Sequence, residues 1–210
     1  MPEIQPRARS QRRGRTRQAL MESALGLVAS KGSFSSLSLR QVARHAGVVP
    51  TAFYRHFADM DALGLALVDE SFRTLRRLMR EVRSSGLPTE QVIRGSVETY
   101  IHYVRDNRMH FRFVIKERFS GSIVTRTAIR QEIRLFTSEL ATDLSRFPMF
   151  NKISAEDLQM IAALVVNNMI AITEEALEAA DDDEELGHML STAEKQIRLI
   201  FLGIDRWRSK

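Results

Sequence analysis

The stretch SLRQVARHAGVVPTAFYRHF, residues 38–57, decides the fold. Ser38 is a suitable N-cap for a short helix that ends at Gly47. Pro50 suits the first turn of a second short helix, which we expect to end near Phe57. Two short helices joined by a tight glycine turn, after a longer supporting helix, predict a helix-turn-helix. The alternative is an ordinary pair of helices whose polar residues are only solvated.

The second short helix has two faces of different chemistry. Phe53 and Phe57 are four residues apart and therefore share one face, where they can anchor the helix on a small core. The other faces carry Pro50, Thr51, Ala52, Tyr54, Arg55 and His56. Small residues at the helix start would let the backbone approach a DNA groove, and the larger polar side chains behind them can reach phosphates.

Positive charge is concentrated in the first third of the chain. The first sixty residues hold ten Lys and Arg against three Asp and Glu, whereas the rest of the chain holds 21 against 23. This asymmetry is the pattern expected of a nucleic-acid-binding head on a body with another task, although a basic tail that only aids solubility is the alternative. The arm residues that we expect to contact DNA are Arg9, Arg12, Arg13, Arg15 and Arg17.

The apolar residues recur at helical spacing along the chain, and strand signals are nearly absent, so we predict an all-α protein. The expected helices are 16–30, 39–46, 50–57, 59–82, 89–106, 108–119, 123–146, 155–179 and 184–207. The expected domains are a flexible basic arm at 1–14, a three-helix helix-turn-helix domain at 15–58, a connecting helix at 59–84 and a C-terminal domain at 85–210. The break near residue 84 rests on the segment SSGLP.

Several classes of function are disfavoured by what the sequence lacks. There is no cysteine, the five histidines are scattered, and no nucleophile-elbow, phosphate-loop or dinucleotide-binding motif is present, so we expect neither an enzyme nor a metal or covalent cofactor. The acidic cluster 181–185 is interpreted as a complement to a helix dipole. The apolar run 160–172 is interrupted by Asn167 and Asn168 and is too short to span a bilayer, so we expect a cytoplasmic protein without membrane contact.

The run SLRQVARHAGVVPTAFYRHFADMDAL, residues 38–63, resembles the N-terminal domain of the TetR family of bacterial repressors. The resemblance implies an all-helical body for ligand binding and dimerisation. It implies that Tyr54 and His56 contact phosphates and that Thr51 and Ala52 lie near base edges. Further candidates for DNA contact are Ser38, Arg40, Pro50 and Arg55.

Two positions depart from the family pattern. Val49 replaces the serine that usually caps the recognition helix, and Met60 replaces the lysine that usually starts the next helix. Since one cap and one phosphate contact are thereby lost, we expect the arginine arm to carry more of the DNA affinity than is usual in the family.

The segment HFRFVIKERFSGS, residues 110–122, resembles more weakly the acyl-CoA-responsive repressors of unsaturated fatty-acid synthesis. Its own pattern is an apolar stripe interleaved with basic residues, which would suit the acyl tail and the phosphates of acyl-CoA. A core helix with solvated basic residues is the alternative. The candidate effector residues are Tyr100, His102, Arg105, Phe111, Arg112, Val114, Ile115, Arg118, Phe119, Asn167 and Asn168. The two asparagines could instead set the register of a dimer.

The last two helices are the expected dimer interface, because the segment 158–172 is apolar on nearly every side and the final helix carries a continuous apolar stripe. Paired with a second copy, they would form a four-helix bundle. The predicted interface residues are Leu164, Val165, Met169, Ile172, Leu190, Ile197, Ile200, Phe201 and Ile204.

Together these features predict a ligand-responsive, homodimeric repressor that binds a palindromic operator in double-stranded DNA. The expected effector is a long-chain acyl-CoA, and the expected regulated process is unsaturated fatty-acid synthesis. One alternative is a repressor of drug efflux that senses another amphipathic ligand. An alternative of another class is an acyl-CoA-binding or acyl-transfer protein without specific DNA binding.

Overall fold

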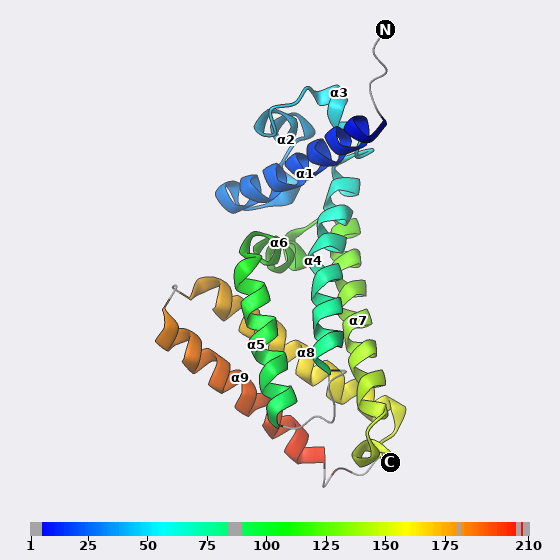
Figure 1. The fold of residues 1–210 in the computed structure, drawn as a ribbon, viewed down its shortest axis with the longest axis vertical. Helices are drawn as coiled ribbons and strands as arrows, with labels where there is room; N and C mark the ends of the chain where they lie inside the picture. Colours follow the sequence, from blue (N-terminus) through cyan, green and yellow to red (C-terminus); the bar gives the residue numbers. More distant parts are fainter. Residues whose placement is uncertain (1–5, 84–89, 180–181, 205–206, 208–210) are drawn as a thin grey trace. The chain divides into compact units, whose positions relative to one another are not determined.

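The computed structural model describes residues 6–83, 90–179, 182–204 and 207, and within them every regular element is helical. The α-helices are α1 Pro6–Lys31, α2 Leu39–His45, α3 Pro50–Phe53, α4 Met60–Arg83, α5 Glu90–Asp106, α6 Arg108–Ser120, α7 Ile123–Ser145, α8 Ala155–Glu178 and α9 Asp183–Ile204. Two short 3₁₀ helices, η1 Phe34–Ser36 and η2 Pro148–Phe150, lie in the connections (Figure 1). The predicted all-α class is therefore confirmed. The predicted chain break at 84–88 lies outside the described residues.

Several helix ends follow from local chemistry that is legible in the sequence. Ser38 forms a capping box with Gln41, in which each residue satisfies a backbone N–H of the other. The Asp59 carboxylate accepts the Ala62 N–H at 2.7 Å and caps α4. Helix α1 ends at Lys31 and is followed by Gly32, whose φ of +99° is a conformation that glycine adopts without a steric penalty.

Helix α1 begins at Pro6, so most of the stretch expected to be a flexible arm is helical. Proline is well placed at the first position of a helix, where its missing N–H has no acceptor within the helix. The residues that follow are mainly arginine, glutamine and alanine, which are good helix formers, and Gly14 is the weakest helix former before the buried part begins. Positive charge alone therefore does not prevent this segment from extending α1.

Helix α3 is shorter than predicted, because regular helix ends at Phe53. The next residues form tighter turns, in which the N–H of Arg55 reaches the carbonyl of Ala52 and that of His56 reaches the carbonyl of Phe53 at 2.8 Å. Phe57 is nevertheless buried, so the turn that follows α3 delivers the second aromatic anchor to the core.

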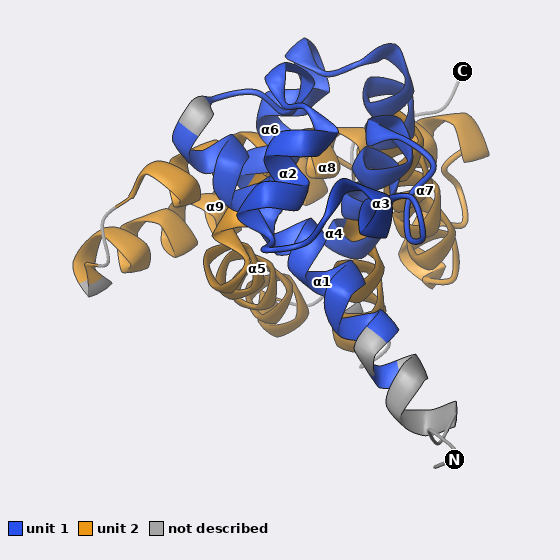
Figure 2. Cartoon of the chain, turned by 90° about the horizontal axis from the view of Figure 1, so that it is seen from above, with its two compact units in different colours: residues 1–71, 112–129 blue, residues 72–111, 130–210 orange. Residues whose placement is uncertain are grey.

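The chain divides into two compact units (Figure 2). Unit 1 comprises residues 1–71 and 112–129, and unit 2 comprises residues 72–111 and 130–210. The division differs from the expected domains in two ways. It falls within α4, and it assigns the end of α6 and the start of α7 to the unit that contains the helix-turn-helix.

The core of unit 1 joins the long first helix to the short ones. The predicted apolar face of α1 is buried, as are the centre of α2 and both aromatic anchors. The buried residues of these elements include Leu20, Ala24, Leu27, Val28, Val42, Ala43, Phe53 and Phe57. Phe34 of η1 packs edge-on against Phe113 of α6, with ring centroids 5.4 Å apart, and so brings α6 into the same core.

Unit 2 is built around the mutual packing of α5, α8 and α9. Tyr100 of α5 shares a hydrogen bond with Thr173 of α8, and Phe150 packs against Phe201 of α9 with ring centroids 6.1 Å apart. Helix α8 is long and apolar enough to cross a membrane by length and composition, which is weak support for a span because core helices of soluble proteins pass the same test. Its buried residues pack within unit 2, as expected of such a core helix.

The turn between α2 and α3 supplies a test of the fold. Gly47 has φ +67°, and an L-residue in this left-handed region is strained by about 1–2 kcal/mol. We predict that Gly47→Ala lowers the free energy of unfolding by about that amount. Gly187→Ala is the matched control, since Gly187 lies inside α9 with nothing within 4 Å of an added Cβ, and this change should stabilise the protein by about 0.5–1 kcal/mol. Urea unfolding followed by circular dichroism measures both, and equal effects would contradict the role given to Gly47.

Candidate nucleic-acid interface and effector residues

The helix-turn-helix is closed by backbone hydrogen bonds around Gly47. The Gly47 N–H reaches the carbonyl of Arg44 at 3.1 Å, and the Val48 N–H reaches the carbonyl of Ala43 at 2.9 Å. Val49 then occupies the N-cap of α3 without a side-chain hydrogen bond, as the sequence led us to expect, and Pro50 takes the first turn. The start of α3 is thus fixed by the turn and by proline.

The orientation of α3 depends on its two aromatic anchors. The Phe53 side chain is fully buried and lies 5.6 Å from the Phe57 ring, centroid to centroid. On the opposite side Tyr54 is 63% exposed, Thr51 and Arg55 are exposed, and Ala52 is half-buried. The predicted separation into an anchoring face and an accessible face is confirmed.

Helix α1 places two arginines beside the turn that follows α3. Arg13 donates a hydrogen bond to the Arg55 carbonyl at 3.3 Å, and the Arg17 guanidinium lies 5.1 Å from the Phe57 ring centroid. His56 lies close to both arginines. We call Arg13, Arg17, Arg55 and His56 the basic cluster. Its members come from two segments of the chain, α1 and the turn after α3, and it concentrates positive charge beside that turn.

The electrostatic environment of the basic cluster shows in His56. Burial lowers the pKa of His56 below its ordinary value of 6.5, and the neighbouring charges of Arg13, Arg17 and Arg55 lower the pKa further. The free protein therefore favours the neutral imidazole at neutral pH. An anion placed among these groups would relieve the repulsion and favour the charged form.

The predicted DNA contacts that are not members of the basic cluster include Arg9, Arg12, Arg15, Ser38 and Arg40. Arg15 and Arg40 are exposed, whereas the side chains of Arg9 and Arg12 lie outside what the structure describes. The Ser38 hydroxyl is already engaged, accepting from the Gln41 N–H at 3.3 Å and donating to the Gln41 side chain at 3.0 Å. The structure shows Ser38 as the N-cap of α2. Its direct contact with DNA stays a prediction.

The predicted effector residues are distributed over both units. In unit 2, Tyr100 and Phe111 are buried, Arg105 and Asn168 are half-buried, and His102 and Asn167 are exposed. In unit 1, Val114 is buried, Ile115 and Arg118 are half-buried, and Arg112 and Phe119 are exposed. One side of α6 is thus part of the core. Phe111 and Val114, at least, fit the alternative interpretation of this segment as a core helix.

Two of these residues have distinctive environments. Burial raises the pKa of Tyr100 to about 12, while the hydrogen bond to Thr173 opposes that shift, so this phenol stays protonated. The Nδ2 of Asn168 is buried and has no hydrogen-bond partner among the described residues. A buried donor without a partner is costly, so Asn168 is a place where a ligand acceptor would add stability.

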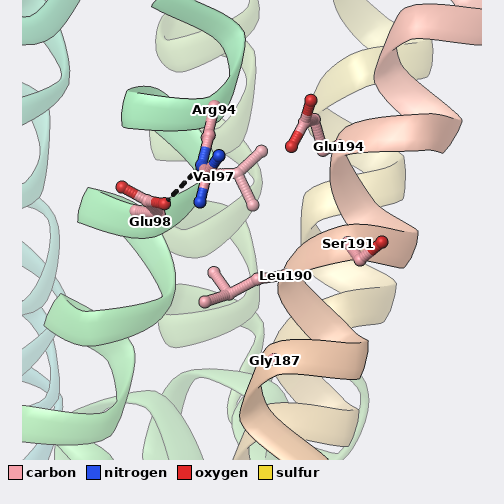
Figure 3. A pocket seen from close by; sticks show the side chains of 7 residues that line it. All are labelled: Arg94, Val97, Glu98, Gly187, Leu190, Ser191 and Glu194. Atoms are coloured by element: carbon pink, nitrogen blue, oxygen red, sulfur yellow. Dashed lines mark hydrogen bonds and ion pairs between the residues drawn. The ribbon is translucent and has the colours of Figure 1, made fainter. Parts of the chain in front are cut away.

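A groove of about 230 Å³ between α5 and α9 was not anticipated from the sequence (Figure 3). Its lining combines apolar and charged side chains, and one wall carries an ion pair between Arg94 and Glu98 at 2.9 Å. In the sequence this i, i+4 pair is indistinguishable from an ordinary solvated pair on a helix. The lining residues are Arg94, Val97, Glu98, Gly187, Leu190, Ser191 and Glu194.

The predicted dimer interface is divided between core and surface. Val165, Ile172, Ile197 and Ile204 are buried within unit 2, Met169, Leu190, Ile200 and Phe201 are half-buried, and Leu164 is half exposed. The large exposed apolar side chains of α8 and α9 are Met160, Leu164, Leu199 and Leu202, of which Leu164 belongs to the predicted set. Both helices are apolar on more than one side, and the packing of unit 2 buries four of the predicted residues. The dimer interface itself stays a prediction.

Within the described residues, no three His, Cys, Asp or Glu side chains gather as metal ligands would.

Comparison with known proteins identifies the family. The model for "Bacterial regulatory proteins, tetR family" matches residues 20–67, and that for "Tetracyclin repressor-like, C-terminal domain" matches residues 88–203. Among solved structures, the chain is similar to a transcriptional regulator from Rhodococcus sp. Rha1, at 19% identity and a TM-score of 0.70 over 91% of this chain and 98% of that one.

Two further solved structures share the fold. The fatty acid degradation regulator FadR from Bacillus halodurans has 13% identity and a TM-score of 0.70, with both chains fully covered. The protein in a SmeT–triclosan complex has 13% identity and a TM-score of 0.68 over 90% of each chain. The second family model alone covers more than half of the sequence. The chain therefore belongs to the TetR family of DNA-binding transcriptional regulators, which respond to small-molecule ligands and are not enzymes.

Proposed function

We propose that the protein is a homodimeric cytoplasmic repressor whose α3 enters the major groove of a palindromic operator. The observation that carries this proposal is the basic cluster beside an accessible, aromatically anchored α3. Tyr54 and His56 would contact phosphates, and Pro50, Thr51 and Ala52 would lie near base edges. Arg13 and Arg17 would bind the backbone next to the same groove and offset the missing lysine at Met60.

The effector that we propose is a long-chain acyl-CoA. The process that the repressor would control is unsaturated fatty-acid synthesis. The resemblance of residues 110–122 supports it, as does the shared fold with a regulator of fatty acid degradation. In unit 2, the unpartnered Nδ2 of Asn168 is a donor suited to the thioester carbonyl of such a ligand. Phosphate contacts by Arg112 and Arg118 stay a prediction.

A second candidate is a repressor of drug efflux. The SmeT–triclosan complex shares the fold and holds a small, largely apolar phenol. The buried Nδ2 of Asn168 would equally donate a hydrogen bond to a phenol or ether oxygen, so this contact alone does not separate these ligands.

The dimer that we propose uses the exposed stripe of α8 and α9. Met160, Leu164, Asn167 and Ala171 follow one another at intervals of three or four residues along α8, as do Gln196, Leu199 and Leu202 along α9. All seven are exposed on unit 2. A second copy packed on this stripe would complete a four-helix bundle and bury Asn167, which could then set the register.

The effector proposal is tested by operator affinity. We predict that the protein protects a palindromic site and that palmitoyl-CoA and palmitoleoyl-CoA change its affinity for that site by different factors, because a cis double bond alters the shape of the tail. Fluorescence anisotropy with each acyl-CoA, with free CoA as control, measures the factors. Equal affinities with both acyl-CoAs would reject lipid sensing, and a response to triclosan alone would favour the efflux candidate.

The basic cluster predicts a pH-dependent affinity. The pKa of His56 is lowered in the free protein and would be raised beside a phosphate, so binding should take up a proton. Operator affinity should therefore increase as the pH falls from about 8 to about 6. The stability of the free protein should change in the opposite direction, because a lowered pKa in the folded state makes protonation below pH 6.5 favour unfolding.

Anisotropy titrations at several pH values measure this linkage, and His56→Gln should reduce the pH dependence. His188→Gln is the control, since His188 is an exposed histidine of α9 in the other unit. A pH dependence that is the same in wild type and His56→Gln would contradict the phosphate contact.

The dimer prediction concerns Leu199, which is 71% exposed at the centre of the α9 stripe. Leu199→Asp should produce a monomer and strongly weaken operator binding, because a charge would be buried at the bundle interface. Light scattering after size-exclusion chromatography should give twice the 24.0 kDa chain mass for the wild type. Leu135→Asp, at an exposed leucine of α7, should stay dimeric; a dimeric Leu199→Asp would place the interface elsewhere.

A further inference from the structure

The buried carboxylate of Glu117 is the feature of unit 1 that DNA contact leaves unexplained. Glu117 lies on α6 with 0% of its surface exposed. Its Oε1 accepts the Phe34 N–H at 2.8 Å and the Ser33 hydroxyl at 3.4 Å, although these residues lie more than eighty positions earlier in the chain. The side chain therefore joins α6 directly to the start of η1.

An apolar side chain could not replace this contact. Phe34 provides the first N–H of η1, which has no acceptor within that helix. Because the hydrogen bond is buried, removing its acceptor would leave the amide without a partner. Oε2 of Glu117 has no hydrogen-bond partner among the described residues, so the contact with η1 accounts for the described hydrogen bonds of this carboxylate.

The surroundings hold both partners in place. A Cβ added at Gly121 would lie 2.6 Å from the Glu117 carbonyl oxygen and 2.9 Å from Oε2, so the turn after α6 closes tightly on the carboxylate. A Cβ at Gly64 would lie 3.1 Å from the Phe34 ring. The ring of Phe34 also packs against the ring of Phe113, which is on α6. Phe34 is thus fixed to α6 through its backbone and its ring.

The position of Phe34 matters because η1 leads into the helix-turn-helix. Only Leu37 separates η1 from Ser38, whose capping box begins α2. Helix α6 in turn starts in unit 2, at 108–111, and continues into unit 1. A shift of α6 along or about its axis would therefore move the Phe34 amide and the segment that begins α2.

We propose that Glu117 is a positioning residue that ties α6 to the start of the helix-turn-helix and transmits movements of α6 to α2. The expected effect on operator binding rests on the proposed repressor function. The contact between Glu117 and Phe34 does not depend on that function. Loss of the acceptor should misplace α2 and its partner α3, and a neutral acceptor of the same length should restore their position.

The contact is tested first without DNA, by amide hydrogen exchange in the full-length protein. The Phe34 N–H should exchange at least about tenfold more slowly than those of Ser35 and Ser36, whose residues are exposed. Glu117→Gln should keep this protection, because its amide oxygen accepts the same bond, and Glu117→Met should remove it. Gly121→Ala should also weaken it, since the added Cβ displaces the carboxylate. If the Phe34 N–H of the wild type exchanged as fast as those of Ser35 and Ser36, the proposal would be overturned.

The positioning role is tested on the operator. Glu117→Met should weaken operator binding about tenfold, equivalent to about 1.4 kcal/mol, and reduce the difference between affinities with and without palmitoyl-CoA. Glu117→Gln should restore both to within about threefold of wild type. Gln131→Met, an exposed change on α7, is the control for adding methionine. Thermal unfolding of each variant separates lost stability from lost positioning.

The outcomes are distinguishable. If Glu117→Met only lowers the unfolding temperature and binds the operator as the wild type does, Glu117 is structural and the proposal is overturned. If Glu117→Met does not fold, Gly121→Ala and Glu117→Gln decide, because Gly121→Ala should lower both the Phe34 protection and the operator affinity, whereas Glu117→Gln should keep both. A wild type that binds no specific DNA site would reject the proposed function, whereas protected Phe34 would still support the contact.

Discussion

The burial of Phe53 is the constraint on which the candidate DNA-binding surface depends. Helix α3 has four residues, far too few to be stable alone, because helix nucleation is unfavourable. Its N-cap, Val49, adds no side-chain hydrogen bond. The direction of the helix must therefore come from tertiary contacts, and Phe53 and Phe57 supply them from one side. The same geometry leaves Tyr54 exposed on the other side.

Much of this fold could be predicted from local sequence. Ser38, Asp59 and Ser154 each begin a helix through a side-chain cap, and Gly32 and Gly47 end or turn one through a positive φ. These signals act within four residues, so a sequence displays them directly. The length of α3 could not be predicted, because its end is set by where Phe57 must reach the core.

The residues that escaped prediction are those whose partners are distant in sequence. Glu117 sits in a run of alternating apolar and basic residues and has the appearance of a surface charge, yet it is fully buried because its partner is a backbone N–H of η1. For a related reason, the sequence did not distinguish the buried from the exposed apolar residues of α8 and α9. A helix that is apolar on several sides gives no unique period, so only the packed structure shows that Ile172 and Ile197 point inward and Leu199 outward.

In the proposed function, the basic cluster would compensate for the N-cap and the phosphate contact that are missing around α3. Burial lowers the pKa of His56, and the charges of Arg13, Arg17 and Arg55 lower it further, because these positive groups repel a charged imidazole. The folded core nevertheless holds them in place, because Arg17 packs on Phe57 and Arg13 bonds to the Arg55 carbonyl. A phosphate would convert that repulsion into attraction without further ordering of the side chains. In the proposed DNA complex, preorganised charge of this kind would offset the absent lysine at Met60, and it depends on the same Phe57 that helps to orient α3.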